Sequence, residues 1–251
     1  MTEIVDIVMG NPDLFARDRS LYRQVPNLAF TSGEEVVTTD QRWMDLAKYR
    51  LPDRGEAFEY YILEGRSVDA IEVTMETSRG CPSNRCIACT IKQCYGGNWR
   101  PFAIEEVIKR IRIFAQSGRT IFRIIDSQFA GPMLTDNEFL ASMQRLEDFA
   151  RGVMQINADL ELEGERRIRI VVFASRVDAF YEQQESPQRR ARRNEVLGLL
   201  AQAGVEKVLI GAESGSDERL QWHRKGITVA QMREAVARIR SHGIRVEAEF
   251  I

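Results

Sequence analysis

The chain has 251 residues, a formal net charge of −2, 44% hydrophobic residues and 29% charged residues. This length allows one large domain or two small ones, with enough apolar residues for a sizeable core. The near-balance of charge excludes a global attraction to nucleic acid or to an anionic membrane. The apolar runs are strand-sized, which excludes a membrane-spanning helix, and residues 1–11 lack the basic start of a secretory signal.

The first part of the chain has no regular pattern. Proline and glycine residues interrupt it repeatedly, which is typical of loops. A helix is predicted over residues 41–49 and a short strand over residues 60–63. We interpret residues 1–65 as an N-terminal extension and residues 66–251 as the main domain.

From residue 69 onwards, short β-branched runs alternate with segments of helical periodicity. The strand candidates are residues 70–77, 120–126, 167–174, 206–212 and 244–251.

Helix candidates lie between these strands. The first opens at Ile104, and Thr135, Asn194 and Thr228 are predicted N-caps of the next three. The second runs over residues 136–152. Gly118, Gly204 and Gly243 each lie between a helix and the following strand, as expected of residues that end helices.

This alternation predicts βαβ units with right-handed crossovers and a parallel sheet. The expected fold class is therefore α/β, with the strands and helices of a partial, TIM-like (β/α) barrel. A complete eight-fold barrel would need three more units. The chain stops inside its fifth predicted strand, so we expect either a partial barrel or one cut after that strand.

Four cysteines, Cys81, Cys86, Cys89 and Cys94, lie within one short window directly after the first predicted strand of the main domain. A disulfide framework would spread its cysteines along the chain, so this crowding favours metal binding. Three interpretations are open from the spacing alone. Three thiolates can hold an iron–sulfur cluster with one iron left open, four can hold structural zinc, or the thiols are simply buried.

Several short segments, around the cysteines and at the ends of the later predicted strands, match motifs of a known protein family. They are Glu76-Thr77-Ser78-Arg79-Gly80-Cys81-Pro82, Arg100-Pro101-Phe102, Asp126-Ser127-Gln128-Phe129, Ser175-Arg176-Val177-Asp178, Gly211-Ala212-Glu213-Ser214-Gly215-Ser216 and Lys225-Gly226-Ile227-Thr228. Together and in this order they resemble the radical S-adenosylmethionine (radical SAM) superfamily. They look most like its branch of methylthiotransferases and cobalamin-associated enzymes, over about residues 70–251.

The resemblance implies a function and two cofactors, a [4Fe-4S] cluster and S-adenosylmethionine. In the family, S-adenosylmethionine chelates the iron that has no protein ligand, and the reduced cluster cleaves it to a 5′-deoxyadenosyl radical. That radical abstracts hydrogen from a substrate, which the sequence does not identify. The implied partners are this substrate and a one-electron reductant such as flavodoxin or ferredoxin.

The resemblance also assigns residues. It makes Cys81, Cys86 and Cys89 the cluster ligands, with four residues in the first gap where the family usually has three. It places Ala88, which stands where the family usually has an aromatic residue, beside the adenine. The other cofactor-binding candidates are Ser127, Arg176, Glu213 and Ser214.

Physical chemistry gives some of these residues further alternatives. The Arg176 guanidinium could clamp the methionine carboxylate bidentately or form a salt bridge with Asp178 or Glu213. Glu213 suits ribose hydroxyls or an ammonium group. Asp126 could touch cofactor or substrate, or could stabilise a turn.

Other residues are assigned no chemistry. We expect Cys94 to be a packed thiol, His223 and His242 to be surface residues, and Lys225 to mark a helix entry. The basic run at residues 189–193 is expected to be a solvated helix start.

Two other functions stay open: a zinc module held by four cysteines that contacts protein or nucleic acid, and a cluster-bearing barrel without activity. Nucleic acid is otherwise not expected as a partner, nor is a membrane, and the expected location is the cytoplasm. Residues 1–65 hold no cysteine and no Asp-x-His-x-x-Gly pattern. We therefore expect neither methylthiotransfer nor cobalamin dependence.

Overall fold

The computed structural model describes residues 19–48, 72–83 and 85–251. The chain divides into two compact units, Met1–Met44 and Asp45–Ile251. The boundary expected near residue 65 and the strand expected over residues 60–63 lie outside the described residues, so both stay predictions.

The smaller unit contains a short helix and a hairpin. The 3-10 helix η1 spans Arg19–Gln24, and β1 (Ala29–Ser32) pairs antiparallel with β2 (Glu35–Thr38). Reciprocal hydrogen bonds between Asn27 and Arg42 close the base of the hairpin at 2.8 Å.

The larger unit is built on a parallel sheet. Within its described part, five strands run in the order β3 (Glu72–Met75), β6 (Ile121–Ile124), β7 (Arg169–Ser175), β8 (Val205–Glu213) and β9 (Arg245–Phe250). All neighbouring pairs are parallel. The predicted α/β class and the five predicted strands are confirmed.

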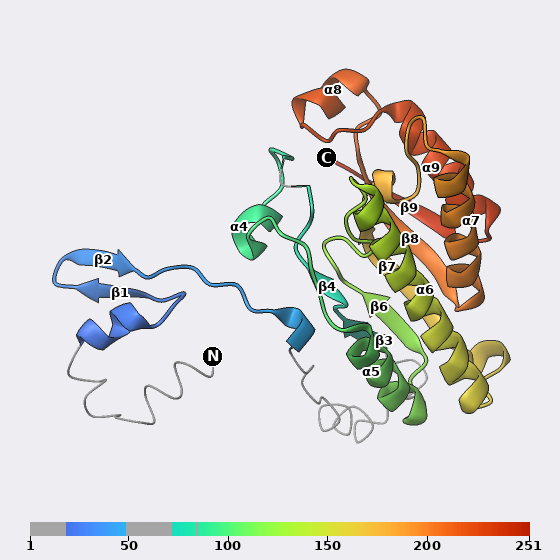
Figure 1. The fold of residues 1–251 in the computed structure, drawn as a ribbon, viewed down its shortest axis with the longest axis horizontal. Helices are drawn as coiled ribbons and strands as arrows, with labels where there is room; N and C mark the ends of the chain where they lie inside the picture. The colour runs from blue at the N-terminus through green and yellow to red at the C-terminus, as the bar shows by residue number, and fades with distance from the viewer. Residues whose placement is uncertain (1–18, 49–71, 84) are drawn as a thin grey trace. The chain divides into compact units, whose positions relative to one another are not determined.

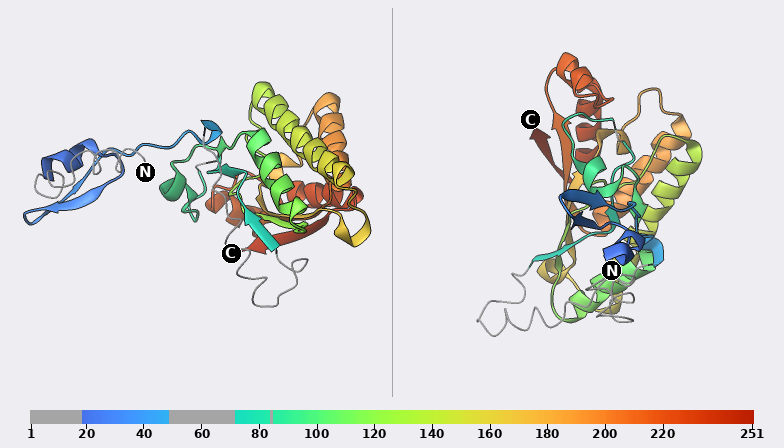
Figure 2. Two further views of the ribbon diagram at one scale, coloured as in Figure 1. Left: turned by 90° about the horizontal axis from the view of Figure 1, so that it is seen from below. Right: turned by 90° about the vertical axis from the view of Figure 1, so that its left-hand side faces the viewer.

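The helices connect these strands in chain order (Figure 1). They are α5 (Ile104–Gln116), α6 (Asp136–Asp159), α7 (Pro187–Gln202) and α9 (Val229–Ser241), with a short α8 (Asp217–Trp222) before α9. Because the strand order follows the chain, right-handed crossovers must place these helices on one face of the sheet. The second view agrees, with α5, α6 and α7 gathered on one side (Figure 2).

Smaller elements complete the larger unit. A two-stranded ribbon pairs β4 (Ser78–Arg79) with β5 (Arg100–Pro101), and α4 (Ile91–Tyr95) lies between its strands in the chain. The 3-10 helices are η2 (Leu46–Lys48), η4 (Gly164–Arg166) and η5 (Val177–Ala179). The helix expected over residues 41–49 is thus reduced to η2 among the residues described there.

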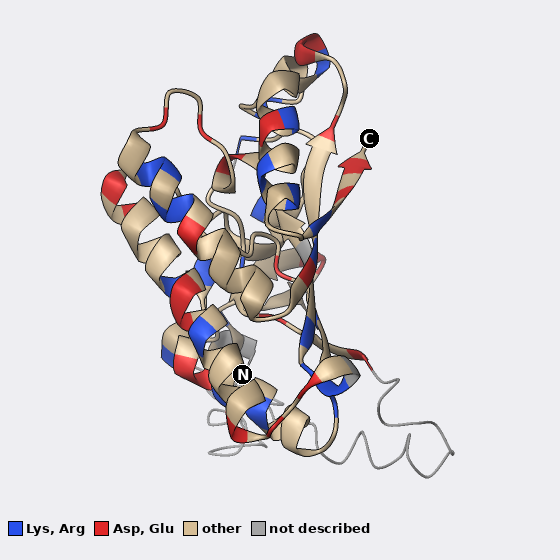
Figure 3. Cartoon of the chain, turned by 90° about the vertical axis from the view of Figure 1, so that its right-hand side faces the viewer, with Lys and Arg blue, Asp and Glu red and all other residues tan. Residues whose placement is uncertain are grey.

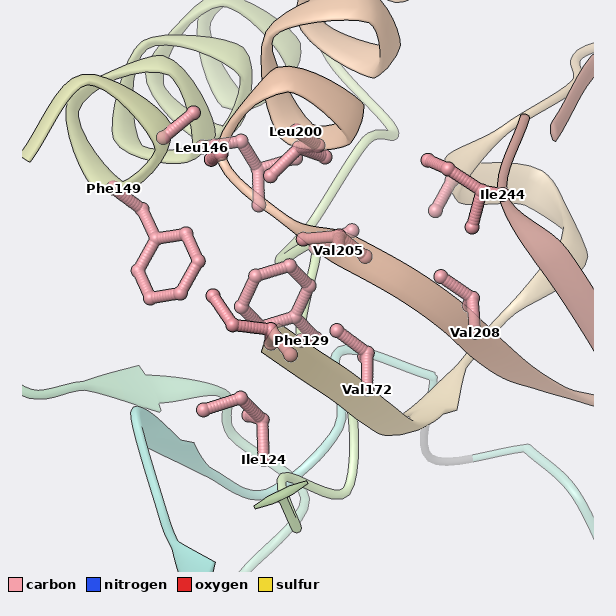
Figure 4. Packing of buried hydrophobic residues seen from close by; sticks show 14 of the residues in the cluster. Ile124, Phe129, Leu146, Phe149, Val172, Leu200, Val205, Val208 and Ile244 are labelled. Atoms are coloured by element: carbon pink, nitrogen blue, oxygen red, sulfur yellow. The ribbon is translucent and has the colours of Figure 1, made fainter. Parts of the chain in front are cut away.

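The core lies between the sheet and the helix layer. Leu146 and Phe149 of α6 and Leu200 of α7 point toward Val172 and Val205 of the sheet (Figure 4). All five side chains are buried. Burying apolar area contributes about 25 cal/mol per Å², so this interface is a main source of stability for the barrel fragment.

Two predicted N-caps are confirmed and one is wrong. Thr135 and Thr228 both form capping boxes, with Glu138 and Gln231 as the reciprocal partners. Asn194, in contrast, lies inside α7, which is capped by Ser186 and has Pro187 in its first turn. The basic run therefore belongs to the helix itself.

The prediction that this basic run is a solvated helix start is also wrong. Arg189 contacts Glu182 and Asp136, Arg192 contacts Glu147, and Arg193 is only 1% exposed. On the face drawn in Figure 3, basic and acidic positions are interspersed along the helices rather than segregated. These arginines are used in ion pairs within the protein.

Glu185 is the centre of the most buried of these ion pairs. Its carboxylate contacts Arg193 of α7 at 2.5 Å and also Arg238 of α9, and its side chain is 6% exposed. Arg193 and Arg238 donate further hydrogen bonds to the backbone carbonyls of Ala179 and Phe180. The triad therefore fixes the segment between β7 and α7 against both helices.

Replacing Glu185 by Gln should lower the free energy of unfolding by about 3 kcal/mol, because two buried guanidinium groups lose their counter-charge. Burial by itself would raise the pKa of Glu185, but the hydrogen bonds and charges of Arg238 and Arg193 outweigh it and lower the pKa. The stabilisation is thus present above the unfolded-state pKa and is lost as pH falls through the lowered value.

Urea unfolding of wild-type and variant chains at neutral and acidic pH measures this difference. Glu195→Gln is the matched control, because Glu195 contacts Arg192 on the same helix but is 55% exposed. The control should change stability by no more than about 0.5 kcal/mol. Equal losses of unfolding free energy in the two variants would show that the buried triad contributes no more than an exposed ion pair.

Candidate functional site

The cysteine loop is closed at its base by the ribbon of β4 and β5. Gly80 follows β4 with φ +85°, and a Cβ atom there would lie 2.1 Å from the carbonyl oxygen of Asn98. No other residue fits this position, since both the backbone angle and the close approach need glycine. The residue before Cys81 is therefore fixed by backbone packing.

Asp126 ties the start of this loop to the neighbouring strand. Its carboxylate, 2% exposed, accepts hydrogen bonds from the Thr77 backbone N–H at 2.6 Å, the Thr77 hydroxyl at 2.5 Å and the Ser78 hydroxyl at 2.7 Å. Burial raises the pKa of Asp126, and the bonds from Thr77 and Ser78 oppose that rise. Asp126 thus links the carboxyl ends of β3 and β6, through partners 48 and 49 residues away rather than within the local turn considered for it.

Trp99 extends this link to the far side of the loop. Its indole N–H lies 3.0 Å from the Ser78 hydroxyl and 2.8 Å from the Gln128 carbonyl oxygen. The two ends of the cysteine loop are therefore both anchored to the segment after β6.

The three predicted ligand cysteines line one cavity. It has a volume of about 460 Å³ and lies at the carboxyl ends of the strands. All four cysteines are free thiols; Cys81 and Cys86 are partly buried, and Cys89 and Cys94 are exposed. Cys94 lies on α4 and is not among the described residues that line this cavity. The expectation that Cys94 is a packed thiol is wrong, because it is exposed.

A larger hollow of about 1080 Å³ lies at the opposite ends of the strands, against Thr120, Ile168 and Gly204. The part of its lining that the structure describes contains no cysteine. In (β/α) barrels the chemistry takes place at the carboxyl ends of the strands. The smaller cavity is therefore the candidate site.

Most of the predicted cofactor residues also reach this cavity. Ala88, Ser127, Arg176 and Glu213 line it, from the cysteine loop and from the ends of β6, β7 and β8. Ser214 is not among its described lining residues; the Ser214 hydroxyl accepts a hydrogen bond from the Ser216 backbone N–H at 3.2 Å. Their roles toward a cofactor stay predictions.

Glu213 ends β8 in a strained conformation. Its φ is +63°, which is uncommon for a residue other than glycine, and the pairing of β8 with β9 shifts register between Gly211 and Glu213. The carboxylate forms an ion pair with Lys225 in which both side chains are largely buried. Such strain at a cavity wall is typical of a functional position.

The Arg176 side chain is held by Asp178. Its Nε lies 3.0 Å from both carboxylate oxygens, and its Nη2 lies 2.7 Å from one of them. The salt bridge foreseen as an alternative is therefore present. A bidentate clamp on a cofactor carboxylate would have to compete with Asp178 for the same edge of the guanidinium.

Among the cavity residues that sequence reasoning did not assign to the site are His223, Lys225 and Glu249. The expectation that His223 is a surface residue is wrong, since it is 9% exposed. Its carbonyl oxygen accepts a hydrogen bond from the Ile87 backbone N–H at 3.2 Å, which brings α8 against the cysteine loop. Lys225 could have been found, because it lies in one of the motifs that carry the resemblance. No sequence signal marked His223, a single histidine at the end of a short helix.

The positive charge that acts on the Cys81 thiol is that of Arg176. Burial raises the pKa of the Cys81 thiol, while a hydrogen bond from the Ser83 backbone and the charge of Arg176 oppose that rise. Burial outweighs both, so the pKa of the Cys81 thiol stays above its ordinary value. Arg79 is instead paired with Glu76 at 2.7 Å.

The cysteines of this cavity match the donors that an iron–sulfur cluster needs. Such clusters are held by closely spaced thiolates, and Cys81, Cys86 and Cys89 are free and line the same cavity. In the described residues, no group of three His, Cys, Asp or Glu side chains is close enough to hold a single metal ion. The residues present therefore fit a cluster by their chemistry.

Comparison with known proteins identifies the family. The family model described as "Radical SAM superfamily" matches residues 75–251. The chain therefore belongs to the radical SAM superfamily, and it is a radical SAM enzyme by family.

Two curated relatives and two solved structures illustrate the likeness. The chain is 27% identical over 184 residues to 4′-phospho-dehydrooxetanocin synthase of Priestia megaterium, covering 71% of this chain and 23% of that protein. It is 27% identical over 175 residues to an uncharacterized methyltransferase of Pyrococcus horikoshii, covering 70% and 31% respectively. The chain thus spans less than a third of the length of either relative.

The structural neighbours share the fold. The cobalamin-dependent S-adenosylmethionine radical enzyme OxsB, with aqua-cobalamin and S-adenosylmethionine bound, matches with a TM-score of 0.75 at 24% identity, over 95% of this chain and 32% of OxsB. The methyltransferase TsrM of Kitasatospora setae, with cobalamin and a [4Fe-4S] cluster bound, matches with a TM-score of 0.63 at 19% identity, over 90% and 41%. The partial barrel is confirmed by these neighbours. No described helix is long and apolar enough to cross a membrane.

Replacing Asp126 by Asn should lower the free energy of unfolding by about 2–3 kcal/mol, since the amide cannot accept all the hydrogen bonds that the carboxylate accepts. Urea unfolding measures this loss. Asp136→Asn is the control, because the Asp136 side chain is 87% exposed. This control should lower the free energy of unfolding by less than about 1 kcal/mol. Equal free energies of unfolding in the two variants would show that the hydrogen bonds of Asp126 contribute little to stability.

Proposed function

We propose that the chain binds a [4Fe-4S] cluster through Cys81, Cys86 and Cys89 and binds S-adenosylmethionine in the adjoining cavity. Once bound and reduced by one electron, this pair supplies reductive carbon–sulfur cleavage and a 5′-deoxyadenosyl radical that abstracts hydrogen from a substrate. The observation that carries the proposal is that the three free thiols share one cavity wall with Ser127, Arg176 and Glu213.

The residues around the cavity have separate tasks in this proposal. Glu213, held by Lys225, accepts hydrogen bonds from the ribose hydroxyls or the ammonium group of the cofactor. Ser127 offers a hydroxyl from the end of β6, and Ala88 leaves space beside the adenine. Leu209, which is buried, supplies apolar surface to the same cavity.

The partners in this proposal are a one-electron reductant, such as flavodoxin or ferredoxin, and an unidentified substrate. Crowded free thiols favour the reducing cytoplasm as the location. OxsB and TsrM bind cobalamin, but the chain spans less than half of each. Their cobalamin dependence is therefore not carried over to this chain.

Anaerobic reconstitution with iron and sulfide should give a brown protein with about four irons per chain. Serine replacement of Cys81, Cys86 or Cys89 should each remove most of the iron, because a cluster needs its thiolates, while Cys94→Ser should retain it. Iron analysis and visible absorbance measure both outcomes. Under reducing conditions the wild-type protein should release 5′-deoxyadenosine from S-adenosylmethionine.

Each alternative has its own outcome in this experiment. A colourless protein with one zinc per chain, lost in Cys94→Ser, would identify a zinc module. A full cluster that releases no 5′-deoxyadenosine would identify an inactive barrel. Either result would reject the proposed reaction.

Replacing Glu213 by Gln should weaken S-adenosylmethionine binding to the cluster-loaded protein by about 10- to 100-fold, since a hydrogen bond to a charged group contributes about 1.5–3 kcal/mol. Equilibrium binding measures the change. Ser214→Ala is the neighbouring control, and it should change the dissociation constant less than threefold. A larger effect of Ser214→Ala than of Glu213→Gln would reverse this assignment of the two residues.

A further inference from the structure

The Arg176 guanidinium has one end fixed and the other directed at a cluster ligand. Asp178 takes its Nε and one hydrogen of Nη2, and the Lys225 carbonyl oxygen accepts from Nη2 at 3.1 Å. The remaining nitrogen, Nη1, lies 3.8 Å from the Cys86 sulfur, within hydrogen-bonding distance for sulfur. The contacts of this side chain thus place a fixed donor against the Cys86 thiol.

The backbone of Arg176 is fixed as well. Its N–H donates to the side-chain oxygen of Gln128 at 2.8 Å, and the Gln128 carbonyl oxygen accepts from the Trp99 indole that anchors the cysteine loop. Gln128 is 1% exposed and the Arg176 side chain is 9% exposed. Arg176 therefore cannot easily move away from Cys86, and water screens its charge little.

A buried positive charge at this distance has a defined effect on an electron acceptor. The potential of an iron–sulfur cluster is set partly by its net charge and by hydrogen bonds to its sulfurs. A cation and an N–H donor at one ligand stabilise the more negative, reduced cluster, and the effect is stronger where the effective dielectric constant is low. Asp178 offsets this charge only in part, because it is 38% exposed.

From this geometry we propose that Arg176 is a positioning residue that acts through Cys86 to raise the reduction potential of the cluster. The inference rests on the proposed function, because it needs a cluster at the three cysteines. It gives Arg176 a task different from the carboxylate clamp first considered for it. Asp178 and the Lys225 carbonyl group serve this task by holding the guanidinium in place.

The test is a spectroscopic redox titration of the cluster-loaded protein without S-adenosylmethionine. Arg176→Met keeps an unbranched apolar stem but removes the charge and the donors of the guanidinium. At a fixed applied potential, its ratio of reduced to oxidised cluster should fall about tenfold, which equals a shift of about 59 mV to more negative potential for one electron. Arg176→Lys keeps the charge without the fork and should restore part of the difference.

Arg85→Met is the matched control. Arg85 precedes Cys86 directly but is exposed, so water and salt screen its charge, and the potential should stay near the wild-type value. An Arg176→Met protein with full iron content and an unchanged potential would overturn the inference. So would an equal shift in Arg85→Met, because the effect would then be one of general charge.

Two further results keep the outcomes separate. If the wild-type chain takes up no cluster, the proposed function is rejected, and this test loses its basis. Should Arg176→Met lose its iron, Arg176→Lys decides the matter: a smaller negative shift supports the inference, and an unchanged potential at full iron content rejects it.

Discussion

The buried carboxylate of Asp126 is the contact on which the rest of the site depends. It gathers two side-chain hydroxyls and a backbone N–H from Thr77 and Ser78 at the end of β3. Its own backbone lies at the end of β6. An isolated buried carboxylate is costly, so this cost is offset only while all its hydrogen bonds are made. The first cysteine follows three residues after Ser78, and its position is therefore coupled to the register of two strands.

Arginines buried beside carboxylates repeat this principle at the later strands. Arg176 with Asp178 follows β7, and Glu185 with Arg193 and Arg238 holds the segment that follows. Buried ion pairs of this kind add little net stability over apolar packing, but removing one partner is strongly destabilising. Their effect is to favour one arrangement of the loops at the carboxyl ends of the strands. The apolar core between sheet and helices supplies the stability, and the ion pairs supply the loop geometry.

Local pattern predicted most of the barrel but not these loops. The β-branched runs marked the five strands, and Thr135 and Thr228 marked two helix starts, because strand propensity and capping depend on neighbours in the chain. The prediction of Asn194 as an N-cap is wrong, because the basic run before it was interpreted as solvent-exposed. Its arginines in fact pair with Glu147, Glu182 and Glu185, which belong to other segments. His223 misled for the same reason: its burial depends on the cysteine loop, which lies far away in the sequence. The cavity residues were found where they belong to the cysteine loop or to a motif that ends a strand.

The backbone is strained where β8 reaches the cavity, and this is consistent with a site rather than with a simple strand end. Glu213 has a positive φ, and the pairing with β9 slips beside it. A Cβ at Gly211 would lie 2.7 Å from the Glu213 carboxylate and 2.8 Å from the Lys225 ammonium group. Glycine at this position therefore lets the ion pair close over the strand and turns the carboxylate toward the cavity. A regular strand end would release this strain and would direct Glu213 elsewhere, so the surrounding contacts must maintain it.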